Sequence, residues 1–203
     1  MKEMSQSNIL DQLKDKIYLI AGDASPRKFY RFNCKKQLLV YCSKDKKNNL
    51  VNYFKINDYL NSNKIKAPFT IKKNVKKNYI IIEDFGDNLI KKIIQKKKNK
   101  FLYFKKIINE LVKLQKIKPS KTLPNYSKKL LINELNLFYQ WYLPEFFSIE
   151  KIKKIKKKMN LILIKHIKQT LKFNKVLVHR DFHIENLILR KGKICLIDNQ
   201  DAV

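Results

Sequence analysis

The sequence predicts an α+β fold of two lobes, a small antiparallel sheet followed by a helical lobe. Three observations predict it: β-type runs alternate with turns as far as Ile82, helical periodicity extends from Asp87 to Lys175, and two short apolar runs around a turn end the chain. With 203 residues, 44% of them hydrophobic, the chain is long enough to bury a core. We expect an N-terminal lobe over residues 1–83, a hinge over 84–88 and a helical C-terminal lobe over 89–203.

In the first lobe, the apolar patterns predict an amphipathic segment, two β-type runs joined to a turn of small residues, a helix and two further strands. In chain order these are Asn8–Ile20, a run ending at Phe32, Gln37–Cys42, Asn49–Asn61, Pro68–Ile71 and Asn78–Ile82.

In the second lobe, helical spacing of apolar residues predicts three helical segments, Phe101–Leu114, Leu130–Phe147 and Ile149–Leu171. The second is rich in aromatic residues around Trp141. Such a group most commonly packs in a core, and a substrate pocket is the alternative. Lysines of the third segment are interpreted as a solvated helix face.

The net charge of +29 raises the question of nucleic-acid binding. It comes from 42 lysines and only 4 arginines, spread over nearly every segment. Specific nucleic-acid surfaces rely on arginine for bidentate contacts and gather their charge on one face. We therefore interpret the charge as compositional background and expect no specific nucleic-acid partner.

The cysteines Cys34, Cys42 and Cys195 form no CxxC pair, and no histidine stands at zinc-ligand spacing from them. Free thiols in a reducing cytoplasm are the simplest interpretation. The chain shows neither a charged-apolar leader nor an uncharged apolar run of spanning length. We expect a cytoplasmic protein without membrane contact.

The C-terminal 28 residues carry the chemistry. Asp181 is followed five residues later by Asn186 and then, after two apolar runs around Lys191-Gly192-Lys193, by Asp198. This is the order of a catalytic loop and a metal-binding aspartate in phosphoryl transfer. That reaction needs one carboxylate to orient a hydroxyl and accept its proton, and oxygen ligands for Mg²⁺. Asp181 suits the first task, and Asn186 and Asp198 suit the second.

A second match is misleading. Asp84-Phe85-Gly86 has the letters of the kinase metal motif, but it lies about a hundred residues before the catalytic loop, whereas that motif must follow the loop. We therefore assign Glu83–Asp87 to the hinge between the lobes, where backbone groups can pair with adenine.

The chain resembles the aminoglycoside/choline kinase-like phosphotransferases and, among them, the bacterial N-acetylmuramate/N-acetylglucosamine anomeric sugar kinases. Four segments carry the resemblance: GDASPRKFYRF (Gly22–Phe32), IIIEDFGD (Ile80–Asp87), LLINELNLFYQWYL (Leu130–Leu143) and LVHRDFHIENLIL with LIDNQDAV (Leu177–Val203). The resemblance implies a protein-kinase-like two-lobe fold. It also implies ATP or GTP as phosphate donor, Mg²⁺, and a sugar hydroxyl as acceptor.

By the same resemblance, Asp181 is the catalytic base and His179 and Arg180 support its loop. Asn186 and Asp198 hold Mg²⁺. The loop Ala24, Ser25 and Arg27 covers the nucleotide phosphates, and Glu83, Asp84 and Phe85 form the adenine hinge. His183 is expected to be structural.

The sequence departs from the family pattern in three places. Asn199 stands where an aromatic residue usually follows the metal aspartate, which is expected to loosen the packing there. No Val-Ala-Ile-Lys strand is present, so Lys44 and Asp58 are nominated for the lysine–acid bridge. The chain ends shortly after Asp198, so the C-terminal lobe is expected to be incomplete.

Three other functions stay open. One is a nucleotide-binding module without catalysis, suggested by Asn199 and the short C-terminus. The second is a basic nucleic-acid-binding protein, disfavoured by the shortage of arginine. The third is a protein kinase, disfavoured because the chain ends where an activation segment and a substrate lobe are expected to begin. The acceptor, the choice between ATP and GTP, and the oligomeric state are not determined by the sequence.

Overall fold

The computed structural model describes residues 9–21, 27–43, 47–120, 123–173 and 175–203. By its internal contacts the chain divides into two compact units, Met1–Lys118 with Leu177–Ala202, and Pro119–Val176 with Val203. The proposed boundaries at residues 84–88 stay a prediction. None of the described helices combines the length and the apolar character needed to cross a bilayer.

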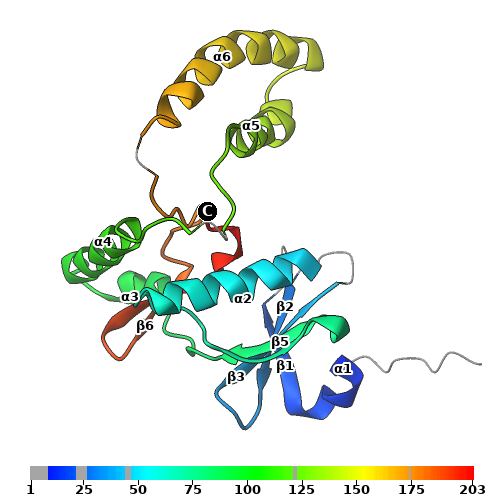
Figure 1. The fold of residues 1–203 in the computed structure, drawn as a ribbon, viewed down its shortest axis with the longest axis vertical. Helices are drawn as coiled ribbons and strands as arrows, with labels where there is room; N and C mark the ends of the chain where they lie inside the picture. The colour runs from blue at the N-terminus through cyan, green and yellow to red at the C-terminus, as the bar shows by residue number, and fades with distance from the viewer. Residues whose placement is uncertain (1–8, 22–26, 44–46, 121–122, 174) are drawn as a thin grey trace, which may run out of the picture. The chain divides into compact units, whose positions relative to one another are not determined.

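The first unit contains a five-stranded antiparallel sheet with the order β1-β2-β3-β5-β4 (Figure 1). The strands are β1 (Ile17–Ala21), β2 (Arg27–Phe32), β3 (Gln37–Cys42), β4 (Thr70–Asn74) and β5 (Tyr79–Glu83). The predicted β-type runs before Phe32 and over Gln37–Cys42 are thereby confirmed, as is the strand that follows Asn78.

Helix α2 (Lys47–Ser62) lies across one face of this sheet and confirms the helix predicted over Asn49–Asn61 (Figure 1). Its apolar stripe enters a core that the strands complete, formed by Val40, Cys42, Leu50, Tyr53, Ile80 and Ile82. Removal of these side chains from water holds helix and sheet together. One polar residue, Asn57, lies on the same buried stripe, and its partner belongs to the site described below.

The remainder of the first unit consists of short helices and a C-terminal hairpin. Helix α1 (Ile9–Gln12) precedes β1, and α3 (Ile90–Lys96) and α4 (Phe101–Gln115) follow the sheet. Strands β6 (Leu187–Arg190) and β7 (Lys193–Leu196) form the predicted hairpin, and a short 3₁₀ turn, η6 (Asn199–Asp201), follows it.

The second unit is helical, as predicted. Ser127 caps α5 (Lys128–Leu137) and Ser148 caps α6 (Ile149–Thr170), in each case by accepting a backbone N–H of the first turn. A π-helical turn (Phe138–Tyr142) and a 3₁₀ turn (Leu143–Glu145) join them. Tyr139 is buried there, but Trp141 is 74% exposed, so the core role expected for Trp141 is wrong.

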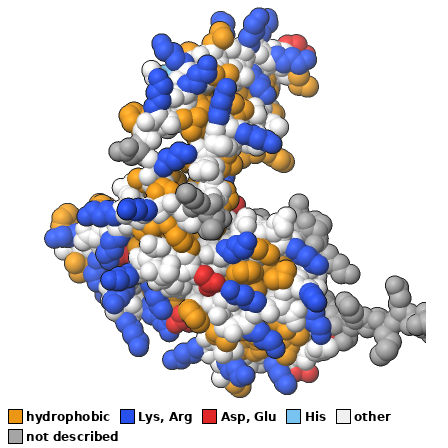
Figure 2. Space-filling model, in the orientation of Figure 1, with side chains coloured by type: hydrophobic (Ala, Val, Ile, Leu, Met, Phe, Trp, Pro, Cys, Tyr) orange, Lys and Arg blue, Asp and Glu red, His pale blue; other side chains and the backbone are white. Residues whose placement is uncertain are grey.

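Basic side chains are spread over the visible face of each unit, with no single stripe standing out (Figure 2). This distribution agrees with the interpretation of the lysine excess as a solvating background.

Candidate active site

The β6–β7 hairpin positions two of the predicted site residues. Lys191 and Gly192 connect its strands with φ angles of 46° and 74°. Positive φ at both central residues is what a two-residue type I′ hairpin turn requires. At the open end, the Ile197 N–H donates to the carbonyl of Asn186 at 3.0 Å. Asn186 and Asp198 therefore stand at the same end of the hairpin, although they lie twelve positions apart in the chain.

Asp181 lies beside Asn186. The Asn186 amide nitrogen Nδ2 donates to Asp181 Oδ2 at 2.8 Å and to the Asp181 main-chain carbonyl at 3.1 Å. Because the amide NH₂ is directed at Asp181, the amide oxygen Oδ1 is the Asn186 atom suited to a cation. The three residues singled out by motif spacing thus form one cluster.

His183 contacts the second carboxylate oxygen of Asp181: its Nε2 lies 3.0 Å from Asp181 Oδ1. Its Nδ1 accepts the backbone N–H of Glu185 at 3.2 Å, so in the neutral imidazole the proton lies on Nε2. His183 therefore donates to Asp181. Both carboxylate oxygens of Asp181 accept hydrogen bonds, which fixes the orientation of the carboxylate.

Asp198 follows β7 in a left-handed conformation, with φ 61° and ψ 41°. Such a conformation is uncommon outside glycine, and where it occurs it often aims a side chain at a functional site. The Asp198 side chain is 34% exposed, and its Oδ1 pairs with the Arg27 Nη2 at 2.7 Å. The guanidinium comes from the start of β2, 171 residues earlier in the chain.

A buried polar network lies beneath the catalytic loop. His179 Nδ1 accepts the Asp181 N–H at 3.3 Å, so Nε2 carries the proton and donates to Asn199 Oδ1 at 2.8 Å. Asn199 Nδ2 in turn donates to Asn57 Oδ1 on α2 at 2.8 Å and to the Leu196 carbonyl at 3.2 Å. The expectation that Asn199 loosens the packing is therefore wrong: its side chain is fully buried and joins the loop to α2.

Replacing Asn199 by Ala is expected to lower the free energy of unfolding by about 1–3 kcal/mol, because His179 and Asn57 would each lose a buried partner. Urea denaturation followed by circular dichroism measures the loss. Asn52→Ala, at an exposed position of α2, is the control and should change the stability far less. Equal stability of the two variants would contradict the role given to this network.

Burial lowers the pKa of His179 below its ordinary value of 6.5, although the hydrogen bond to Asn199 opposes the shift. The unfolded chain therefore takes up a proton near pH 6.5 that the folded chain does not yet bind. Stability should consequently fall as the pH drops below 6.5, until the folded-state pKa is reached. Urea midpoints at pH 7.5 and about 5.5 should differ less for His179→Gln than for the wild type. His166→Gln, at an exposed histidine, should retain the wild-type difference.

Arg180 holds the loop from its other side. Its φ of 69° is left-handed, and its Nη1 donates to the main-chain carbonyl of Asp201 in η6 at 3.2 Å. His179 and Arg180 thus both connect the loop carrying Asp181 to the residues that follow Asp198. Their supporting role stays a prediction with a structural basis.

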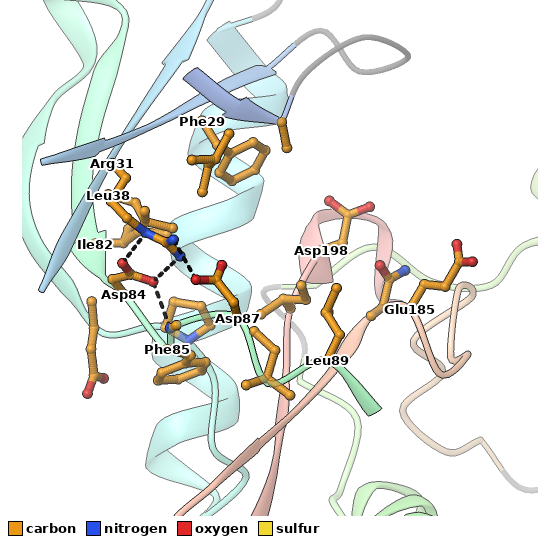
Figure 3. Close-up of a pocket in the computed structure, with 18 of the residues that line it drawn as sticks. Phe29, Arg31, Leu38, Ile82, Asp84, Phe85, Asp87, Leu89, Glu185 and Asp198 are labelled. Atoms are coloured by element: carbon orange, nitrogen blue, oxygen red, sulfur yellow. Dashed lines mark hydrogen bonds and ion pairs between the residues drawn. The ribbon is translucent and has the colours of Figure 1, made fainter. Parts of the chain in front are cut away.

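A cavity of about 580 Å³ adjoins this cluster, and all of its lining belongs to the first unit. Its walls come from β1, β2, β3, α2, β5 with the segment after it, and the hairpin, and they include Glu83 and Asn186. Asp84, Phe85 and Asp198 also line it (Figure 3). The volume lies within the range of small-ligand pockets. The hinge assigned from chain order and the predicted metal residues therefore line one cavity.

Ion pairs hold the hinge segment. Arg31 of β2 donates to both oxygens of Asp84, at 2.6 and 3.1 Å, and to Asp87 at 2.8 Å (Figure 3). Glu83 pairs with Arg190 of β6 and with Lys66. The Asp84 side chain is thus occupied by Arg31, which leaves the backbone of this segment as the part suited to an adenine ring.

Phe85 belongs to a second core. It is buried with Ile188 and Cys195 of the hairpin, and the cations of Arg190 and Lys66 lie 5.1 and 5.8 Å from the centre of its ring. The predicted hinge is thereby packed directly on the hairpin that positions the predicted metal residues.

Three predicted residues, Ala24, Ser25 and Lys44, lie outside the described residues. Asp58, nominated as the partner of Lys44, is described and forms an ion pair with Lys73 of β4 at 2.8 Å.

The predicted metal ligands are one carboxylate and one amide. Within the described ranges, no group of three or more His, Cys, Asp and Glu side chains gathers as a metal site. Mg²⁺ does not need one, since it usually keeps waters and is held by one or two carboxylates together with substrate phosphates. Asn186 Oδ1 and Asp198 therefore fit such an ion.

The sequence profile of the phosphotransferase enzyme family matches residues 79–203, more than half of the chain. The chain belongs to this family. The matched region contains the hinge segment and the cluster of Asp181, Asn186 and Asp198.

Curated relatives of the phosphotransferase include two N-acetylmuramate/N-acetylglucosamine kinases. The chain is 24% identical over 188 residues to the one from Neisseria meningitidis serogroup B, covering 90% of this chain and 56% of that protein. It is 23% identical over 184 residues to the one from Pseudomonas aeruginosa, with coverages of 90% and 54%. The chain thus spans about half the length of the curated relatives it matches.

Solved structures show the same fold. The streptomycin–ATP ternary complex of APH(2″)-IIa matches with a TM-score of 0.67 at 15% identity, covering 100% of this chain and 72% of that chain. Choline kinase LicA from Streptococcus pneumoniae matches with a TM-score of 0.62 at 14% identity, with coverages of 96% and 68%. These likenesses confirm the α+β kinase-like fold of the phosphotransferase.

Sequence reasoning missed four residues that support the site: Arg31, Tyr53, Asn57 and Gln200. For Asn57 a signal existed, because it lies on the apolar stripe of α2 with Leu50, Tyr53 and Leu60, where a polar residue needs a buried partner. Arg31, Tyr53 and Gln200 carried no comparable signal.

Proposed function

We propose that this chain is the nucleotide-binding and catalytic part of a Mg²⁺-dependent small-molecule kinase. The reaction transfers the γ-phosphate of ATP or GTP to a hydroxyl of an amino sugar such as N-acetylmuramate or N-acetylglucosamine. The observation that supports it best is the convergence of Asp181, Asn186 and Asp198 beside a cavity of about 580 Å³ that extends to the hinge. The curated relatives named as N-acetylmuramate/N-acetylglucosamine kinases support the choice of acceptor.

In this proposal Asp181 orients the acceptor hydroxyl and takes its proton. The hydrogen bonds from His183 and Asn186 orient the Asp181 carboxylate at one end of the hairpin, where it can accept that proton. Asn186 Oδ1 and Asp198 would hold Mg²⁺, which when bound neutralises charge on the β- and γ-phosphates. His179 and Arg180 keep the loop in place. Ala24 and Ser25 are proposed to cover the nucleotide phosphates, whereas Arg27, at the start of β2, pairs with Asp198.

The nucleotide base lies against the hinge. Phe85 and Leu89 offer an apolar wall. The N–H groups of Glu83, Asp84 and Gly86 already donate within the protein, so the ring edge would pair with other backbone groups of the hinge. The described cysteines are free thiols, which agrees with a reducing compartment such as the cytoplasm.

Nucleoside diphosphate release tests this proposal. The purified chain is incubated with Mg·ATP or Mg·GTP and one acceptor at a time: N-acetylmuramate, N-acetylglucosamine, kanamycin or choline. Release that depends on an amino sugar and disappears with EDTA is the expected result. Nucleotide binding in calorimetry without turnover on any acceptor would favour the nucleotide-binding module, and failure of both assays would overturn the proposal.

A further inference from the structure

Among the described residues of strand β3, the cation that protein kinases place beside the nucleotide phosphates has no counterpart. In protein kinases a strand lysine pairs with a helix glutamate, and this pair must be in place together with the metal aspartate. Strand β3, whose residues are all described, reads QLLVYC and contains no lysine. The only acid on α2 is Asp58, which pairs with Lys73 on its exposed side.

A different cation occupies the interior. Arg27, at the first position of β2, is only 2% exposed. Its guanidinium lies 5.0 Å from the centre of the Tyr53 ring and 5.6 Å from that of Phe29. Aromatic faces stabilise a desolvated guanidinium. Burial raises the pKa of Tyr53 to about 12, so the α2 ring facing the cation stays a neutral phenol.

The Arg27 guanidinium is directed at the residues after β7. Nη2 donates to Asp198 Oδ1 at 2.7 Å, and Nη1 donates to Gln200 Oε1 at 2.5 Å. The two bonds use the planar fork that distinguishes arginine from lysine. They fix one oxygen of the metal aspartate and leave Oδ2 for a cation.

We propose that Arg27 takes the place of the strand lysine and acts through Asp198. It is a positioning residue that orients the Asp198 carboxylate for Mg²⁺, rather than a residue that binds the triphosphate. A side chain that is 2% exposed and held by Asp198, Gln200 and Tyr53 would have to leave all three to reach a phosphate. This inference rests on the proposed function, since it assumes that Asp198 binds the metal.

The test separates metal dependence from nucleotide affinity. Arg27→Met removes the charge and keeps an apolar stem. Arg27→Lys keeps the charge and loses the planar guanidinium group that donates both hydrogen bonds. Lys28→Met, at the exposed neighbouring position of β2, is the matched control. For each protein, calorimetry gives the ATP dissociation constant in EDTA and the Mg²⁺ concentration that half-saturates the gain in ATP affinity.

Loss of a residue that orients a metal ligand typically costs about 10–100-fold in metal affinity. We expect Arg27→Met to raise the half-saturating Mg²⁺ concentration within that range, Arg27→Lys to raise it less, and neither to change ATP affinity in EDTA. In a protein that already carries Asp198→Asn, adding Arg27→Lys should not change the half-saturating Mg²⁺ concentration further, because the two residues act as a unit. This second comparison keeps the test decisive if Arg27→Met does not fold.

An equal loss of ATP affinity with and without Mg²⁺ would show that Arg27 binds the phosphates directly, and the inference would be wrong. Unchanged Mg²⁺ dependence in folded variants would also overturn it, while leaving the proposed function standing. If the wild type itself shows no Mg²⁺-dependent ATP binding, the proposed function fails, and the role of Arg27 fails with it.

Discussion

Asp181→Asn is expected to lower kcat by about 10²–10⁴-fold, the usual contribution of a general base, while the dissociation constant for Mg·ATP stays near its wild-type value. The amide cannot take the acceptor proton. Its carbonyl oxygen can still accept a hydrogen bond from Asn186 or His183, so the loop should keep its shape. Steady-state kinetics with the acceptor that supports nucleoside diphosphate release gives kcat, and calorimetry gives the dissociation constant for Mg·ATP.

Asp11→Asn makes the same chemical change at an exposed carboxylate of α1 and serves as the control. It should retain wild-type turnover. An Asp181→Asn variant that also turned over at the wild-type rate would rule out Asp181 as the base.

Asp198→Ala is expected to abolish most of the Mg²⁺-dependent gain in ATP affinity. Asp198 supplies the only carboxylate of the proposed metal pair. Its removal should therefore lower the Mg²⁺ affinity by more than the roughly 10–100-fold that is typical when a residue that only orients a ligand is lost. Because Arg27 stays buried and loses its anion, the melting temperature should also fall. Calorimetry gives the ATP dissociation constants at saturating Mg²⁺ and in EDTA, and a thermal melt gives the melting temperature.

Asp201→Ala is a suitable control, since Asp201 lies three residues further on and its side chain is more than half exposed. It should retain Mg²⁺-dependent binding. If Asp198→Ala bound Mg·ATP as tightly as the wild type, the assignment of Asp198 to the metal would be wrong.

Local patterns were sufficient for most of the secondary structure. Short β-type runs bounded by turns predicted β2, β3 and β5, and the turn Lys191-Gly192-Lys193 predicted the hairpin that carries the site. The segment predicted to be amphipathic over Asn8–Ile20 was less informative, because its second half becomes strand β1 by pairing with β2. Pairing with a strand further along the chain overrides a short-range pattern.

Exposure was harder to predict than periodicity. The stripe over Phe101–Leu114 forms helix α4, but within it Ile107 and Leu114 are buried while Phe101 and Ile108 are exposed. Periodicity shows which residues share a face of a helix, and only the packing of other elements decides how much of that face is covered.

The sequence by itself determined the order of the candidate site residues: a carboxylate at Asp181, an amide at Asn186 and a second carboxylate at Asp198, with the earlier Asp-Phe-Gly excluded by its place in the chain. These residues are joined by one loop and one tight hairpin, so spacing along the chain almost fixes their spacing in space. Only the tertiary structure decided what holds them. Arg27 reaches Asp198 from 171 residues away, and Asn57 reaches Asn199 from 142 residues away. Such pairings depend on how α2 and the sheet pack against the hairpin, and no local pattern encodes that packing.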